Sequence, residues 1–431
     1  MVSLVVAAFA VGYGGKMINR GYRFKLYPTK DQANLFIQFA GVCRAVYNLA
    51  FEQRRDHWRL FKSRTGKSIS YPSQARELTA LRAEYDWVAA VHVTPLQQAL
   101  RDLDRSYKTF FDGGSKYPSP RKKGLNESFR FQGREVQTRK LNAKWSDVKL
   151  PKIGWVRYRD TRLLTGKLNN ATISQTADGW HISFNIAIEH VTPASALPIS
   201  VGIDRGVAQT LALSTGEIMV MPPSLAALER RKRKAKRVLS RRRRGSARYA
   251  KQRRRVAAIQ AKQVSIRKDW HHRAALDLSK RFGTVVLESL NIKSMTASAK
   301  GTLAKPGRRV RQKSGLNRSI LNQGWHIFET LLAYKLEQRG GHLCKVPAHF
   351  TSLTCAECGA VDRKSRKSQA RFICHHCGHA ANADTNAAIN ILRRNTSSMV
   401  VEEGRWLSVE AITGTRVNPS ENPPSLGGGG C

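Results

Sequence analysis

The chain has 431 residues, and its 75 Lys and Arg against 30 Asp and Glu give a formal charge of +45. This length predicts about two to four domains with buried cores and excludes a small stapled module. The positive charge predicts a polyanionic partner, of which nucleic acid is the leading kind. With 41% hydrophobic residues, the composition excludes a fully disordered or histone-like chain, so we expect a folded, basic protein.

The N-terminal residues and the cysteines bear on location. No stretch reaches the roughly 18–20 apolar residues of a membrane span, and the apolar run at residues 2–10 lacks the charged start of a signal peptide. Because well-patterned sequence begins at Met17, we interpret residues 1–16 as a leader that is not native. Seven cysteines, four of them within 23 residues, are unlike a disulfide framework and predict a cytoplasmic protein without a membrane partner.

The first half of the chain changes from a helical to a strand pattern. Apolar residues recur at helical spacing from Lys30 to about Phe111, apart from a polar interruption at Lys62–Ser73 and a proline, Pro95, that can open a later helix. Between Tyr117 and Ile188, short alternating runs are broken by Gly and Asn clusters, which is typical of β-strands. A helical part therefore precedes a β-rich part.

The second half alternates strands with helices. Ile199–Met221 predicts two or three strands with a hairpin turn at Ser214-Thr215-Gly216. Further strands are expected at Thr284–Leu287 and His342–Val346, with an amphipathic helix at Gly324–Arg339 between them. This alternation favours an α/β core.

Two segments have unusual compositions. Residues 395–431 carry four acids and two Arg and end in a Pro- and Gly-rich sequence, which predicts a disordered tail. Residues 230–255 hold 16 Lys or Arg and no acid, which predicts a solvated helix or helix pair. A solvated face or a localisation signal is the ordinary explanation, but charges at this density repel one another unless phosphates lie among them. The candidate contacts to a nucleic-acid backbone are Arg230, Arg231, Lys232, Arg233, Arg241, Arg242, Arg243 and Arg244.

The cysteines Cys355, Cys358, Cys374 and Cys377 form two CxxC pairs separated by fifteen residues. Each pair presents two thiolates from one turn, and two pairs complete a closed tetrahedral zinc site. A glycine directly follows each pair, where the chain must fold back tightly. Four protein ligands leave no open position for water, so we expect a structural Zn²⁺, with four unrelated reduced cysteines as the alternative.

Three acids stand at the edges of predicted elements. Asp204 and Glu288 end apolar strand segments, and Asp384 precedes a helical segment. Because carboxylates beside buried strands are costly unless cations neutralise them, a divalent metal is an economical explanation. Two Mg²⁺ ions bridged by such carboxylates would activate a water and stabilise the leaving oxygen of a phosphodiester. Each acid also has an ordinary alternative, as a helix N-cap for Asp384, a turn residue for Asp204 and a solvated strand end for Glu288.

Several of these segments resemble the TnpB (OrfB) proteins encoded by insertion sequences. The resemblance lies in the two CxxC pairs and in residues 201–206 (VGIDRG), 285–292 (VVLESLNI) and 382–391 (NADTNAAINI). The order Asp, Glu, zinc ribbon, Asp is the specific part. The N-terminal half is similar at residues 27–32, 44–48, 100–108 and 150–154, so the resemblance covers about residues 18–394.

The resemblance implies a small RNA-guided DNA endonuclease related to type V CRISPR effectors, with a multidomain fold of α+β and α/β type. A wedge-type β-barrel is implied for residues 17–30 and 117–192, with a helical recognition lobe inserted at residues 31–116. A ribonuclease H-like RuvC nuclease domain is implied for residues 198–394, with a zinc ribbon inserted at residues 350–380.

Carried over position by position, the resemblance assigns Asp204, Glu288 and Asp384 as the catalytic triad that holds two Mg²⁺ ions, and the four cysteines as zinc ligands. It also implies a guide RNA from the transposon end, double-stranded target DNA, and a location at the nucleoid of a prokaryotic cytoplasm. Tyr71 and Gln97, an aromatic and an amide in the recognition lobe, are candidates for reading a short flanking motif. The oligomeric state stays open.

Three other functions fit parts of the sequence. A catalytically weak or inactive RNA-guided DNA-binding protein that regulates transposition or transcription would share the fold, but the three acids are intact. A strand-transfer transposase typically has Glu as its third acid and no four-cysteine ribbon before it. A zinc-ribbon transcription factor leaves most of the chain unexplained. We therefore favour guided cleavage by two-metal hydrolysis.

Overall fold

The structure, a computed structural model, describes residues 16–399 except 62, 63, 65, 67, 126, 191, 192, 194–196 and 369. The predicted leader therefore lies outside the described residues apart from its last residue, as does the predicted tail from residue 400 onward. Contacts divide the chain into two compact units, residues 1–194 with 222–271 and residues 195–221 with 272–431. Within the described ranges, no helix combines the length and apolar character needed to cross a bilayer.

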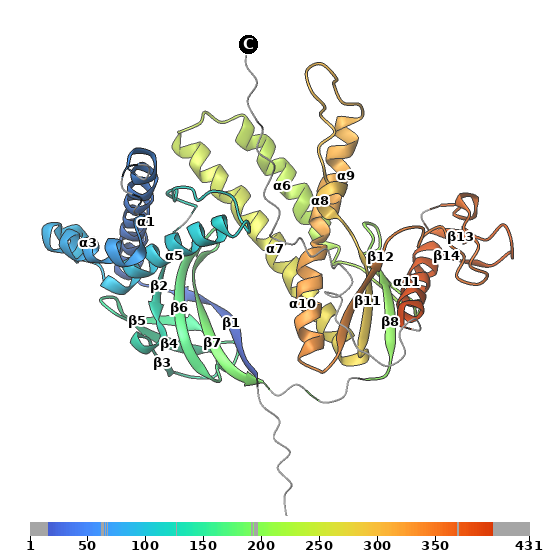
Figure 1. Cartoon of the computed structure of the whole chain (residues 1–431), viewed down its shortest axis with the longest axis horizontal. Helices are drawn as coiled ribbons and strands as arrows, with labels where there is room; N and C mark the ends of the chain where they lie inside the picture. The colour runs from blue at the N-terminus through green and yellow to red at the C-terminus, as the bar shows by residue number, and fades with distance from the viewer. Residues whose placement is uncertain are drawn as a thin grey trace, which may run out of the picture. The chain divides into compact units, whose positions relative to one another are not determined.

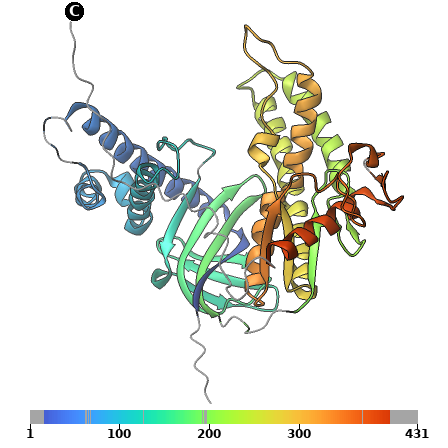
Figure 2. The same cartoon turned by 45° about the vertical axis from the view of Figure 1, so that its right-hand side comes forward.

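A seven-stranded antiparallel sheet forms the frame of the first unit (Figures 1 and 2), in the order β2-β6-β7-β1-β5-β4-β3. The central strand β1 pairs with β7 through Lys16–Lys25 and with β5 through its last two residues. It therefore begins one residue inside the predicted leader. The strands are β1 Lys16–Tyr27, β2 Ser128–Gln132, β3 Gln137–Lys140, β4 Trp145–Leu150, β5 Gly154–Arg159, β6 Lys167–Thr176 and β7 Gly179–His190, with a 3-10 turn η1 at Gly133–Glu135.

Among the described residues, four helices between β1 and β2 accompany this sheet, and Figure 1 shows α1, α3 and α5 gathered beside it. The long helix α1 begins in a capping box, in which the Thr29 hydroxyl accepts from the Gln32 N–H and the Gln32 side chain accepts from the Thr29 N–H. On its buried face, Phe36 and Phe39 pack against the rings of Phe129 on β2, at centroid distances of 5.7 and 5.3 Å. The helices are α1 Lys30–Leu60, α3 Tyr71–Glu84, α4 Asp86–Ala89 and α5 Val93–Phe111.

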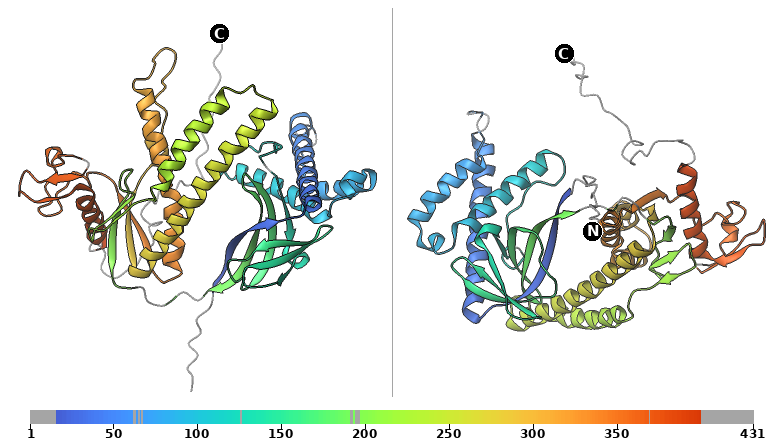
Figure 3. Two further views of the ribbon diagram at one scale, coloured as in Figure 1. Left: turned by 180° about the vertical axis from the view of Figure 1, so that it is seen from behind. Right: turned by 90° about the horizontal axis from the view of Figure 1, so that it is seen from below.

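The arginine-rich segment forms the predicted helix pair, α6 Ser224–Ser240 and α7 Ala247–Arg281 (Figure 3). The two helices run antiparallel, because Gln252 on α7 donates to the Ala235 carbonyl at 2.8 Å and Gln263 donates to the Glu229 carboxylate at 3.0 Å. Helix α7 continues well past the end of the basic run. We call this element the basic hairpin.

A five-stranded sheet forms the core of the second unit, in the order β10-β9-β8-β11-β12. Strands β8, β11 and β12 are parallel, whereas β9 and β10 are antiparallel to their neighbours, which confirms the predicted strands and the hairpin turn at residues 214–216. The carboxyl ends of β8 and β11 therefore lie at one edge. The strands are β8 Ser200–Asp204, β9 Leu211–Leu213, β10 Ile218–Met219, β11 Thr284–Ser289 and β12 His342–Pro347.

Helices and a small ribbon complete the second unit. The predicted amphipathic helix is confirmed as α10 Trp325–Glu337, but the preceding helix α9 Val310–Gln323 was not predicted, because its apolar positions are sparse. The last helix α11 runs from Ala383 to Met399, so the predicted start of a disordered tail at residue 395 is wrong by five residues. The remaining elements are α8 Ile292–Met295, η2 Arg363–Ser365, β13 Arg371–Ile373 and β14 Ala380–Asn382.

A glycine in β8 permits α11 to pack closely on the sheet. A Cβ at Gly202 would lie 2.2 Å from the Ala388 carbonyl oxygen and 2.7 Å from the Leu392 nitrogen, both on α11. Contacts this short are sterically impossible, so any side chain at this position would force the helix away from the strand. The close approach places the first turn of α11 beside the end of β8.

We expect Gly202→Ala to destabilise the second unit by about 1–3 kcal/mol, because it overpacks the contact between β8 and α11. Urea unfolding and loss of hydrogen-exchange protection in α11 measure this effect. Gly21→Ala on β1 is the control, since a Cβ there meets nothing within 4 Å and should change stability by less than about 0.5 kcal/mol. Equal stability of the two variants would contradict the steric argument.

Candidate active site and metal centre

The three predicted acids belong to neighbouring elements of the second unit. Asp204 is the last residue of β8, and Glu288 lies next to the end of β11, the strand paired with β8 in parallel. Asp384 lies in the first turn of α11, which packs on β8 and β11. Acids from three separate segments are thus collected at the carboxyl edge of the parallel strands, where ligands bind in open α/β sheets.

The ordinary alternatives for these acids do not match the structure. Asp204 is not a turn residue, because it pairs with Ala212 of β9 inside the sheet. Glu288 is not a solvated strand end, because it is only 9% exposed. Asp384 is not the N-cap of α11, because the Asn382 side chain accepts from its N–H at 3.0 Å and performs the capping. A role as a turn residue, a solvated strand end or a helix cap therefore explains none of the three side chains.

The negative charges of two of these acids affect the pKa of the third. Burial, followed by the negative charges of Glu288 and Asp384, raises the pKa of Asp204 to about 7. Burial also raises the pKa of Asp384, against the opposing effect of Arg366, whose guanidinium lies 3.4 Å from the Asp384 carboxylate. Glu288 and Asp384 therefore both lie within electrostatic reach of Asp204.

Neighbouring residues hold Glu288 in place. The Thr351 hydroxyl donates to a Glu288 carboxylate oxygen, and buried Arg205 donates to the Glu288 backbone carbonyl. Arg205 also lies 3.2 Å from the carboxylate of Glu329, which pairs with Lys345 on β12. This ion-pair chain links the end of β11 to α10 and to β12.

The acid cluster suits divalent cations by its donor chemistry, because buried carboxylates are the ligands of hard cations such as Mg²⁺. The ligand atoms of the three acids lie farther apart than those of the cysteines. Among the described residues, only the four cysteines form a group of three or more candidate ligand atoms that all lie within 4.8 Å of one another. Two ions about 3.5–4 Å apart spread their ligands more widely than one ion does.

The two cysteine pairs form matching knuckles. Cys355 Sγ lies 3.7 Å from Cys377 Sγ, and Cys358 Sγ lies 3.6 Å from Cys374 Sγ. These separations fit a tetrahedron with Zn–S bonds of about 2.3 Å. The glycine after each pair, at residues 359 and 378, has a φ of +74° and donates its N–H to the carbonyl of the first cysteine of the pair. The cluster can therefore hold zinc.

Backbone amides also prepare these sulfurs for metal binding. The N–H groups of Cys377 and His376 point at Cys374 Sγ, at 3.5 and 3.4 Å, and lower the pKa of that thiol to about 6. The Glu357 N–H makes the equivalent contact to Cys355 Sγ at 3.4 Å. N–H donors favour the thiolate, which is the form that binds zinc.

Two buried asparagines on α11 tie the acid cluster to the first cysteine knuckle. Asn386 accepts from the Ala356 N–H at 2.8 Å and donates to the Thr354 carbonyl at 2.8 Å. Asn390 donates to the carbonyls of Thr354 and Thr351 at 2.7 and 3.0 Å. Since Thr351 also donates to Glu288, one continuous set of hydrogen bonds joins α11, the knuckle and the carboxyl end of β11.

The sequence analysis assigned no role to these supporting residues. Asn386 and Asn390 stand four residues apart on the buried face of α11, at 0% and 6% exposure, where apolar residues are expected. Amides at such positions indicate buried hydrogen bonds, so this signal was present in the sequence. The sequence gives no comparable signal for Arg205 and Thr351, because their hydrogen-bond partners are distant in the chain.

The basic hairpin presents its charges to solvent. Of the 16 Lys and Arg in residues 230–255, all are exposed except Lys232, which pairs with Glu229 at 2.6 Å. In the described part of the chain, none of the other fifteen forms an ion pair within 4 Å, although the Arg233 charge acts on Glu229 and helps to lower its pKa. The turn between the helices consists of the four consecutive arginines Arg241–Arg244 followed by Gly245 at a φ of +86°. The hairpin is thus a concentrated, unneutralised positive surface.

The two candidate readers of a flanking motif lie on helices of the first unit that pack together, Tyr71 at the start of α3 and Gln97 on α5. The Arg101 guanidinium lies 5.1 Å from the Tyr71 ring centroid, and Arg101 Nε donates to the Tyr71 hydroxyl at 3.1 Å. Tyr71 is thereby oriented by a neighbour rather than merely solvated. Base reading by Tyr71 and Gln97 stays a prediction.

Family models match three parts of the chain. One described as "Probable transposase" (OrfB_IS605) matches residues 183–299, and one described as "Cas12f1-like, TNB domain" matches residues 325–391. A third, described as "Helix-turn-helix domain" (HTH_OrfB_IS605), matches residues 17–63. That segment folds here as strand β1 followed by the single helix α1, so it is not a helix-turn-helix.

Curated relatives span nearly the whole chain. It is 37% identical over 397 residues to a protein of Escherichia coli (strain K12) named "Putative RNA-guided DNA endonuclease InsQ", covering 91% of this chain and 97% of that protein. It is 29% identical over 393 residues to a Streptomyces pristinaespiralis protein named "Putative RNA-guided DNA endonuclease", covering 90% and 92%.

A solved structure described as a Cas12f1–sgRNA–target DNA complex matches with a TM-score of 0.53 and 16% identity, covering 84% of this chain and 83% of that chain. At this identity the match shows the fold alone. The class is therefore a multidomain, mixed α/β protein with the architecture of a Cas12 effector. Within that class, the chain belongs to the TnpB (OrfB) family, which confirms the resemblance found in its residues.

We expect Cys374→Ser to lose its zinc and to unfold residues 350–380 locally, because a segment this small buries little apolar surface without metal. Metal analysis and limited proteolysis measure the two effects. Cys344→Ser, a half-buried cysteine outside the cluster, should retain zinc and resist proteolysis. A zinc-free Cys374→Ser protein that folds normally would refute the structural role.

We expect Asn386→Ala to destabilise the knuckle by about 1–3 kcal/mol, because it leaves the buried Ala356 N–H without its partner and removes one of the two amide donors to the Thr354 carbonyl. The measurement is faster transfer of zinc to a colorimetric chelator. Thr385→Ala on the same helical turn is the control, since the Thr385 side chain makes no hydrogen bond in the described chain. Identical transfer rates for both variants would argue against coupling between α11 and the knuckle.

Proposed function

We propose that this chain is an RNA-guided endonuclease that hydrolyses phosphodiester bonds of double-stranded target DNA next to a short flanking motif, in association with a transposable element. The observation that carries this proposal is the meeting of three acids at one sheet edge, where Glu288 and Asp384 are buried and both lie within electrostatic reach of Asp204. The names of relatives that span nearly the whole chain support it.

The three acids would hold two Mg²⁺ ions. Bound Mg²⁺ supplies charge stabilisation and a more acidic water for attack on phosphorus. The chain's own part is to fix the acids, because Thr351 orients the Glu288 carboxylate and Arg205 holds its backbone. Arg366, at 3.4 Å from Asp384, balances part of the negative charge while the carboxylates are buried. Only the ionised carboxylates bind a cation well, so proton release accompanies metal binding.

The finer domain assignment is part of the same proposal. The parallel strands β8, β11 and β12 with α11 support a ribonuclease H-like RuvC domain within residues 198–394, and the paired knuckles support a structural zinc ribbon at residues 350–380. The antiparallel sheet supports a wedge domain from residues 17–30 and 117–192. The helices between them correspond to a recognition lobe at residues 31–116.

Guide RNA and target DNA would be held by backbone contacts. The basic hairpin supports this, because its exposed charges form no close ion pairs in the described chain and can replace condensed counterions on phosphates. Such contacts carry no sequence information, so specificity would come from pairing between a guide RNA encoded at the transposon end and one DNA strand.

The central test begins with the protein purified after expression beside its native locus, with any bound RNA sequenced. We expect the complex with Mg²⁺ to cut a matching plasmid, and Asp204→Ala or Glu288→Ala to lower the cleavage rate by at least about 10³-fold, as expected when an essential electrostatic group is removed. RNA content and zinc content should not change. Retained cleavage in either variant removes that residue from the metal site, and specific DNA binding without cutting by the unaltered complex supports a guided binder instead.

Changing Arg241–Arg244 to Gln should weaken DNA binding most at low salt. The slope of log K against log salt should fall by up to about 0.9 for each lost phosphate contact, and the preferred target sequence should not change. The matched control changes four exposed basic residues of the first unit, Arg76, Lys108, Lys144 and Arg159. An equal loss of slope in both variants would show that the hairpin is no more than general surface charge.

A further inference from the structure

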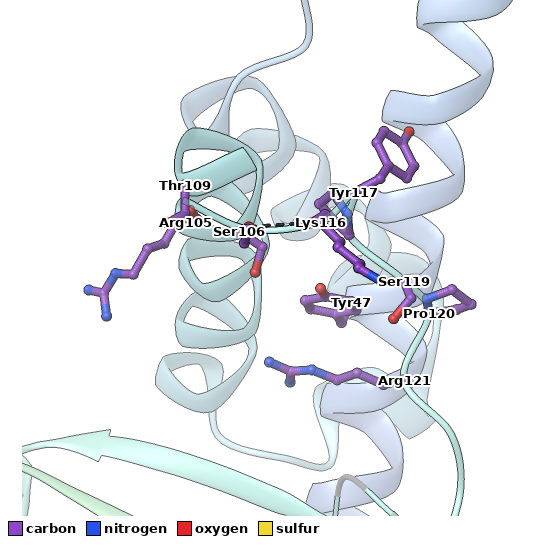
Figure 4. A pocket seen from close by; sticks show the side chains of 11 residues that line it. Tyr47, Arg105, Ser106, Thr109, Lys116, Tyr117, Ser119, Pro120 and Arg121 are labelled. Atoms are coloured by element: carbon purple, nitrogen blue, oxygen red, sulfur yellow. Dashed lines mark hydrogen bonds between the residues drawn. The ribbon is translucent and has the colours of Figure 1, made fainter. Parts of the chain in front are cut away.

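A hollow of about 500 Å³ lies in the first unit between helix α5 and the segment of residues 115–121, which leads from α5 toward β2. It belongs to neither the acid cluster nor the cysteine knuckles. In Figure 4 the side chains of Tyr47, Lys116, Ser119 and Arg121 gather beside α5, whereas Arg105 and Tyr117 point away from this group. Its volume is within the range of sites for small ligands.

The walls of the hollow are held in place by the chain itself. The Arg121 N–H donates to the Asn48 side chain at 2.8 Å, and Asn48 donates back to the Arg121 carbonyl at 3.1 Å. At the other end, the Gly114 N–H donates to the Thr109 carbonyl at 2.9 Å. Between them, the Tyr117 ring packs edge-on against Phe110 at 5.3 Å. The site is therefore formed without a ligand.

Tyr47 presents a hydroxyl donor to the hollow. The residue is 5% exposed and lines the hollow, and its hydroxyl has no hydrogen-bond partner among the described residues. The hydroxyl is not one of the buried side-chain atoms that lack a partner, so the buried ring holds an accessible polar end. The Ser119 hydroxyl, on an exposed residue that also lines the hollow, has no partner in this part of the chain either. Two fixed hydroxyl groups are thus free to bind a ligand in the hollow.

The charge around the hollow is positive. The Arg121 guanidinium lies 4.1 Å from the Tyr47 ring centroid and pairs with Asp102 at 2.9 Å, but Asp102 also pairs with Arg130. One carboxylate therefore serves two guanidinium groups. Lys116 is exposed and has no ion-pair partner in the described chain, and no acid lines the hollow. Cationic and hydroxyl donors together suit a phosphate group.

We propose that this hollow binds one unpaired nucleotide of an RNA or DNA strand, with its phosphate accepting from Lys116, Arg121 and the Tyr47 hydroxyl. An unpaired nucleotide can enter a confined concave site, whereas a stacked base pair cannot. The inference rests on the proposed function in that it takes nucleic acid as the partner, and it adds a subsite in the first unit that is separate from the acids and from the basic hairpin.

The test uses the full-length protein without added Mg²⁺ and two photoreactive probes, short oligouridine and oligodeoxythymidine strands containing 5-iodouracil bases. Peptide mapping should place crosslinks in residues 115–121 or at Tyr47. Tyr47→Phe keeps the ring and its stacking with Arg121 but removes the hydroxyl, so crosslinking there should fall about three- to tenfold. Lys116→Gln should lower it at least as much, whereas Lys108→Gln, an exposed charge on α5 outside the hollow, should not.

Crosslinks absent from these segments, or equal yields for Tyr47→Phe and the unaltered protein, would overturn the proposal. Equal losses for Lys116→Gln and Lys108→Gln would also overturn it, since surface charge would then suffice. Because Lys116 is exposed, its replacement leaves the fold intact and keeps the test interpretable. Crosslinking to one probe identifies its strand type, and crosslinking to both supports the phosphate as the shared feature. Guided cleavage is measured in a separate assay. Loss of cleavage and loss of crosslinking in the hollow can therefore be told apart.

Discussion

The packing of α11 on β8 is the contact on which the candidate active site depends. Gly202 permits it, because even a methyl group there would overlap the helix backbone. The contact carries Asp384 to the strand edge where Asp204 and Glu288 already lie, and so it brings two buried carboxylates within electrostatic reach of a third. That group is unfavourable by itself, and divalent cations are the natural way to neutralise it.

The first cysteine knuckle is also connected to the candidate active site. The segment that leads into the first knuckle supplies Thr351 to Glu288 and is fastened to α11 by Asn386 and Asn390. Zinc binding would fold that segment, and the hydrogen bonds would then position the acids. A structural metal would in this way influence a reaction that it does not touch, through a short polar network.

Acids are scarce in this protein, and their placement explains why its surface is so basic. Many of them are used in partly buried pairs, as in Arg44 with Glu127 and Arg205 with Glu329, where each fixes a distant part of the chain. Few are left to neutralise exposed cations. The unpaired charge is consequently concentrated on the basic hairpin and, on a smaller scale, at the hollow beside Tyr47.

The sequence alone determined the features whose cause is local. The CxxC spacing places four thiolates within reach of one ion, alternating apolar residues specify the strands of both sheets, and a run without acids specifies a solvated helix pair. Family motifs added the pairing of Asp204, Glu288 and Asp384 as one candidate site. The length of α7 and the existence of α9 did not follow, because their apolar positions are few and tertiary packing stabilises them.

Tertiary structure decided what depends on residues far apart in the chain. Only the fold shows that Asn382 rather than Asp384 caps α11, that Arg205 and Thr351 support Glu288, and that the asparagines of α11 form hydrogen bonds to the first cysteine knuckle. The hollow beside Tyr47 is of the same kind, since its walls come from α1, α5 and the segment before β2. Such contacts leave no periodic signal, because each is formed by segments that meet only when the chain is folded.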